Sequence, residues 1–145
     1  MDIQKELIDE FERETESTRK LLNAIPADAD FSWKPHDKSM TLGRLASHVG
    51  DTAGDWAVHT LTTDLLEWTP DMTPEKWDSH WKFVAGDQTW IDDTKYRVFR
   101  TWVVNHMVHH RAQLGVYLRL LGAKIPGMYG PSADEMPAAE PAEVA

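Results

Sequence analysis

The chain of 145 residues contains no cysteine. This absence excludes a disulfide framework, a nucleophilic cysteine and a zinc site built on thiolates. A metal ion would have to be bound by histidine and carboxylate side chains instead. The sequence also lacks a run of about 18 apolar residues, which a membrane-spanning helix requires. Its opening stretch, MDIQKELIDEFERE, is charged and predicts no signal peptide, so we expect a cytoplasmic protein.

Positive charge is scarce, because 15 lysines and arginines face 24 aspartates and glutamates, which leaves a net charge of −9. Proteins that bind nucleic acid usually carry a basic patch. Anionic membrane surfaces likewise attract basic segments. We therefore expect neither a nucleic-acid partner nor docking on a membrane.

Apolar residues recur at helical spacing in three stretches of the chain, namely residues 2–25, 40–66 and 94–121. Ser39 or Thr41 can cap the second of these helices, and Gly122 is suited to end the last one. Long helices joined by moderate loops pack as an antiparallel bundle. The predicted fold class is therefore all-α.

The segment 70–93 is less regular. Thr73 and the proline after it can begin a short helix, and an alternating run with a possible turn at Gly86 then favours a hairpin or an irregular flap. Residues 132–145 are rich in proline, alanine and glutamate, which predicts a disordered acidic tail. A single helical domain would then cover residues 1–131.

The most informative motif is a cluster of histidines in the last predicted helix. His106 and His110 are four residues apart, so both project from one helix face. With His106 set at zero, His110 lies at about 40° and the apolar residues Phe99 and Val103 lie at about 20° and 60°. Imidazole nitrogens that face a core must be satisfied, and a shared metal ion would satisfy one on each ring. The alternative is a pair of core histidines bonded to neighbouring side chains or to water.

A third ligand would have to come from another helix. His48 and His59 both lie in the second predicted helix, and their spacing alone does not decide between them. Asp51 and Asp55 are nearby as further ligands or as hydrogen-bond partners of the ligands. The zinc-protease motif is absent, because Met107 stands where that motif needs glutamate. No Gly-x-Ser-x-Gly element of a serine hydrolase is present either.

Two blocks of sequence are similar to one family. The run HMVHHRAQLGVYLRLLG from His106, followed by IPGMYGPSADE, resembles the last helix and tail of DinB-like proteins, the damage-inducible, YfiT-like metal-binding bundles. The block SWKP from Ser32, followed by TLGRLASH ending at His48, resembles the entry to the second helix of that family. The resemblance covers most of the chain.

The resemblance implies an up-down-down-up four-helix bundle with a metal site of three histidines. Transferred to this chain, the ligands are His48, His106 and His110. The implied metal is one divalent ion, zinc or nickel first and iron or copper as alternatives. Related members include S-transferases and isomerases that use mycothiol, bacillithiol or glutathione-like thiols, so a small-molecule substrate and a low-molecular-weight thiol are the expected partners.

The chain departs from this pattern in its third helix. A helix from Thr73 to Phe83 would be only about 16 Å long, against about 40 Å for its neighbours. One side of the bundle would lack cover, and exposed apolar helix faces need burial. We therefore expect a shortened third helix and a homodimer.

Two classes of function follow from a three-histidine site. In a metal-dependent enzyme, the ion would supply an ionised water or thiol at neutral pH for hydrolysis or S-transfer. In a non-catalytic bundle, the ion would only stabilise the fold or report metal supply. An interaction module without metal is a third possibility. No general base can be identified. We expect Arg111 to form a surface ion pair rather than bind a substrate carboxylate, and we expect three tryptophans to belong to the core rather than to a pocket, namely Trp33, Trp56 and Trp102.

Overall fold

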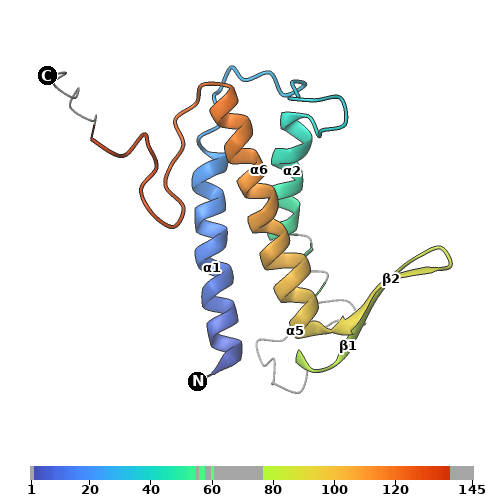
Figure 1. The fold of residues 1–145 in the computed structure, drawn as a ribbon. Coiled ribbons are helices and arrows are strands. Elements are labelled where there is room, and N and C mark those ends of the chain that lie inside the picture. The colour runs from blue at the N-terminus through green and yellow to red at the C-terminus, as the bar shows by residue number, and fades with distance from the viewer. Residues whose placement is uncertain (1, 55, 58–59, 61–76, 138–145) are drawn as a thin grey trace, which may run out of the picture.

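The structure is a computed structural model that describes residues 2–54, 56–57, 60 and 77–137. Its main elements are three long helical segments that lie side by side (Figure 1). Helix α1 spans Ile3–Leu22, helix α2 spans Leu42–Ala53, and the third segment runs without a break through α5 (Lys95–Val98), η1 (Phe99–Asn105) and α6 (His106–Leu120). Helices α1 and α6 point in the same direction and α2 in the opposite one. None of the described helices combines the length and apolarity needed to cross a membrane.

The helix ends follow local signals, of which the sequence predicted those at Thr41 and Gly122. Asp2 caps α1 and Thr41 caps α2, each by accepting a hydrogen bond from a backbone N–H three residues later. Helix α6 ends at Gly122, whose φ of 75° is favourable only for glycine among common residues. The N–H groups of Gly122 and Ala123 donate to the carbonyls of Arg119 and Leu118, which is the Schellman arrangement.

The segment that precedes α5 is a β-hairpin. Strands β1 (His80–Ala85) and β2 (Gln88–Thr94) pair in antiparallel register and project away from the helices (Figure 1). The turn lies at Gly86, with φ of 60°, where the sequence indicated it. The hairpin that the sequence favoured here is confirmed, and the helix considered from Thr73 does not reach Phe83, because His80–Phe83 are in a strand. Residues 73–76, where that helix would begin, lie outside the described residues.

The described chain is therefore largely helical, as expected, but it is not a purely helical four-helix bundle. It holds three long helices and one two-stranded sheet among the described residues. Helix α2 ends at Ala53, and most of the predicted extension to residue 66 lies outside the described residues.

The core consists of two main apolar clusters at the two ends of the bundle. The cluster near the C-terminus of α6 joins all three long helices, and it contains Leu21, Leu42, Leu45, Val49, Leu114, Tyr117, Leu118 and Ala123. The cluster near the N-terminus of α1 contains Leu7, Ala57, Trp77, Phe99, Val103 and Val104. Residues 106–111 of α6 lie between these clusters, in the middle of the bundle.

The side chains of the π-helix η1 divide between the core and the surface. Val103 and Val104 are both buried, while Trp102 is 37% exposed. The expectation that Trp102 belongs to the core is therefore wrong, because the buried face of the last helical segment is centred on Met107 and Leu114 and not on His110.

A buried ion pair connects α6 to α1, which the sequence did not predict. Arg111 is 2% exposed, and its Nη2 atom lies 2.6 Å from Oε2 of Glu14. Arg111 also donates to the carbonyl of Glu14 and to the hydroxyl oxygens of Thr18 and Tyr129. The Tyr129 hydroxyl in turn donates to Glu14 over 2.8 Å. Arg111 thus forms an ion pair as expected, but the expectation that the pair lies at the surface is wrong, because both side chains are buried.

The chain after α6 folds back beside α1 (Figure 1). The carboxylate of Asp134 accepts hydrogen bonds from Arg119 and from the backbone N–H of Ile125. That of Glu135 accepts from the backbone N–H of Gly127. Residues 132–137, the first part of the predicted tail, are among the described residues. Residues 138–145 lie outside the described residues.

We predict that replacing Arg111 with methionine lowers the free energy of unfolding by about 3–5 kcal/mol, because Glu14 would keep a buried charge without its partner. The double variant Glu14→Leu with Arg111→Met should lose less than the sum of the single variants. Urea denaturation measures both values. Arg119→Met is the matched control, since its exposed pair with Asp134 should contribute less than about 1 kcal/mol. Equal losses for the two arginine variants would contradict the prediction.

Candidate metal centre

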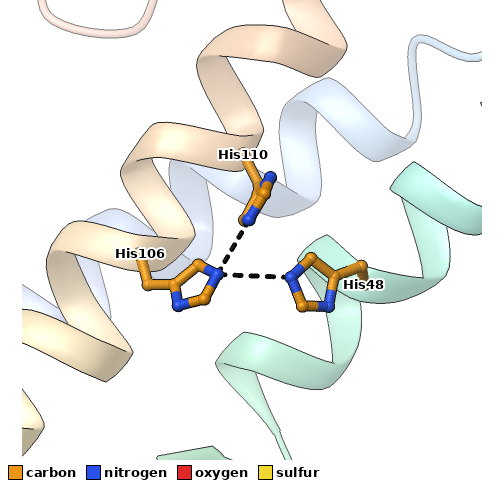
Figure 2. A group of neighbouring side chains, drawn as sticks. All are labelled: His48, His106 and His110. Carbon is orange, nitrogen blue, oxygen red and sulfur yellow. Dashed lines mark hydrogen bonds between the residues drawn. The ribbon is translucent and has the colours of Figure 1, made fainter. Parts of the chain in front are cut away.

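Three histidines meet in the middle of the bundle, between α2 and α6 (Figure 2). His106 and His110 lie one turn apart on α6, and His48 faces them from α2. Buried apolar residues next to the histidines pack α2 against α6. Val49 directly follows His48, and Leu114 lies one turn after His110. All three histidines are partly buried.

The Nε2 atoms of the three rings point toward one another. Nε2 of His106 lies 3.3 Å from Nε2 of His48 and 2.8 Å from Nε2 of His110. One ligand nitrogen from each of the three residues lies within 4.8 Å of the others. The structure thus brings together the three residues that the sequence analysis predicted as ligands. Asp51 is exposed and is not part of the group, and Asp55 and His59 lie outside the described residues.

This spacing fits a divalent metal ion. Histidine nitrogens lie about 2.0–2.1 Å from zinc, so two of them are about 3.3 Å apart on a tetrahedral ion and about 2.9 Å apart at a right angle. The two observed separations correspond to these values. Three imidazole nitrogens are also the donor type that zinc, nickel, copper and iron accept.

The electrostatics of the site favour neutral rings, which metal binding requires. Burial lowers the pKa of His106 to about 4, with further lowering from positive charge on His110 and His48. Burial also lowers the pKa of His110, against a smaller raising effect of its hydrogen bond with Gln113. At pH 7 both rings therefore have an unprotonated nitrogen available.

The aromatic residues considered from the sequence have different positions relative to the site. The ring of Trp102 lies 6.1 Å from that of His106, centroid to centroid, and borders the site. Trp33 packs edge-on against Tyr117 at the edge of the C-terminal cluster, and Trp56 packs against Phe83 of the hairpin. The core assignment therefore agrees with the contacts of Trp33 and Trp56.

Two features of the surroundings were missed in the sequence analysis. Gln113 on α6 is hydrogen-bonded to both His109 and His110, and its position three residues after His110 was the available signal. In addition, a depression of about 420 Å³ adjoins His110, and its lining includes Lys38, Ser39, Met40, Leu45, Gln113 and Tyr117. The loop that carries Lys38 approaches α6 here because the Tyr117 hydroxyl donates to the carbonyl of Met40.

Comparison with known proteins defines the class to which this chain belongs. Residues 83–143 match the sequence model of the DinB family, a segment that contains two of the three histidines. The chain is also similar to a curated relative, with 30% identity over an alignment of 149 positions. The alignment covers 86% of this chain and 87% of the relative. The chain therefore belongs to the DinB family.

The relative is the protein YrdA of Bacillus subtilis strain 168, whose description is "uncharacterized protein". This similarity therefore supports the family assignment but does not indicate an activity for this chain. No solved structure matches this chain.

We predict that the metal-free protein loses stability as the pH falls from about 6.5 to about 4. His106 takes up its proton near pH 6.5 in the unfolded chain but near 4 in the folded chain, so the unfolded state binds more protons between these values. Urea denaturation of chelator-treated protein measures the loss, and an NMR titration locates the pKa of His106. His106→Ala should show a smaller loss. An unshifted His106 titration would contradict the prediction.

Proposed function

We propose that this DinB-family protein binds one divalent metal ion through His48, His106 and His110 and acts as a cytoplasmic metal-dependent enzyme of the thiol S-transferase or hydrolase type. One observation carries the proposal: three Nε2 atoms converge, and no fourth histidine or carboxylate joins them among the described residues. Catalytic zinc sites usually have three protein ligands and an open position, whereas structural sites have four.

The residues around the site support a small-molecule substrate. When bound, the ion supplies a Lewis acid that lowers the pKa of a water or a thiol. The three histidines hold the ion, and the neutral state of His106 and His110 at pH 7 keeps protons from competing with it. The depression beside His110 has the volume of a small-ligand site. Lys38 on its rim is suited to an acidic group of the substrate, a role that buried Arg111 cannot fill.

A second candidate is a metal-stabilised or metal-sensing bundle without catalysis, acting as a homodimeric binding module. The observation that favours it is the position of the histidines between the two apolar clusters, where an ion would tie α2 to α6. The homodimer is supported by large apolar side chains that stay exposed on α6, since Val116 and Leu120 are 59% and 61% exposed. Light scattering that shows only monomer at micromolar concentration would contradict it.

We predict that protein purified without a histidine tag binds about one divalent ion per chain, because the three histidines offer one group of three ligand nitrogens. His48→Ala, His106→Ala and His110→Ala should each lower the affinity at least 100-fold, whereas His36→Ala, on an exposed loop, should not. Elemental analysis and chelator competition measure these values. Wild-type affinity in all three site variants would exclude the proposed site.

We predict that the bound ion keeps a position open to thiols. Cobalt(II)-loaded protein should develop a sulfur-to-cobalt absorption band on addition of a low-molecular-weight thiol, because three imidazoles leave a ligand position free. The same metal-loaded protein should then either transfer the thiol to an electrophile or hydrolyse an ester. A screen of thiol cosubstrates with electrophiles and esters measures both activities. A spectrum that no added thiol or anion changes would favour the non-catalytic candidate.

A further inference from the structure

Gln113 links the metal centre to the surface of α6. Its side-chain oxygen lies 2.8 Å from Nδ1 of His110, and its side-chain nitrogen lies 3.1 Å from Nε2 of His109. Nε2 of His110, on the other side of the ring, lies 2.8 Å from Nε2 of His106. The His110 ring therefore stands between the amide of Gln113 and the point where the three histidines meet.

The chemistry of these contacts selects one form of the His110 ring. An amide oxygen only accepts hydrogen bonds, so Nδ1 of His110 must carry the proton that is donated to Gln113. In a neutral imidazole only one nitrogen carries a proton, so Nε2 of His110 then presents a lone pair toward His48 and His106. The opposite tautomer would place a hydrogen on Nε2, which could not bind an ion.

The contact with His109 agrees with an amide oxygen that faces inward. The NH₂ group of Gln113 can only donate, and Nε2 of His109 accepts this hydrogen bond from the exposed side. With its nitrogen held there, the amide turns its oxygen to His110. All three residues are on α6, at spacings of three and four residues, so a rigid helix holds the whole arrangement.

We propose that Gln113 is a positioning residue that holds His110 in the tautomer with its Nε2 lone pair directed into the three-histidine site. Among the described residues, Gln113 is the one side chain hydrogen-bonded to the second ring nitrogen of a predicted ligand. Its effect on metal affinity rests on the proposed function, but the tautomer it selects does not. Partners of this kind typically change metal affinity 10–100-fold.

The test compares Gln113→Leu with Gln113→Glu. Leucine has similar size and accepts no hydrogen bond, whereas glutamate keeps an acceptor for Nδ1 of His110. Zinc affinity, measured by chelator competition, should fall 10–100-fold in Gln113→Leu and return to the wild-type value or above in Gln113→Glu. Gln4→Leu on α1 is the matched control and should leave the affinity unchanged.

A second readout separates this inference from the proposed function. Long-range ¹H–¹⁵N NMR of chelator-treated protein reports which nitrogen of His110 carries the proton. The wild type and Gln113→Glu should show the proton on Nδ1, and Gln113→Leu should show a mixture. If the wild type binds no zinc but shows this tautomer pattern, the proposed function fails and the positioning role stands. If Gln113→Leu keeps both the wild-type tautomer and the wild-type zinc affinity, the positioning role is overturned.

Discussion

Each of the three histidines turns one ring nitrogen toward the same point between α2 and α6, and a half-buried nitrogen of this kind needs a partner. Apolar clusters on both sides of the rings hold the two helices close enough for the nitrogens to meet. Burial also keeps the pKa of His106 low, so its ring stays unprotonated at neutral pH. A shared divalent ion would satisfy all three nitrogens at once.

The helix that carries two of these histidines is fixed by charge as well as by apolar packing. Arg111 directly follows His110 and turns to the opposite side, where it pairs with Glu14 of α1 and with Tyr129 after the helix. A buried guanidinium and carboxylate are stable only when both are fully hydrogen-bonded, which restricts the position of α6 relative to α1. Adjacent residues of one helix thus lie in two different environments, His110 in the three-histidine group and Arg111 in the core.

The π-helix η1 ends where the site begins. Its last residue is Asn105, directly before His106, and Arg100 spans this wider turn by hydrogen bonding to Asn105 and pairing with Glu10 of α1. π-Helical turns are uncommon and are frequent at functional sites. Within this segment Trp102 lies at the surface beside His106, while Val103 and Val104 are in the core.

The sequence by itself determined the features that depend on neighbouring residues: the three helical stretches, the stop at Gly122, the hairpin turn at Gly86 and the shared face of His106 and His110. Spacing could not choose His48, and only the resemblance to DinB-like proteins did so. Tertiary structure decided that the three rings meet and that Arg111 pairs with a residue 97 positions earlier. Such contacts join segments far apart in the chain, and local periodicity contains no information about them.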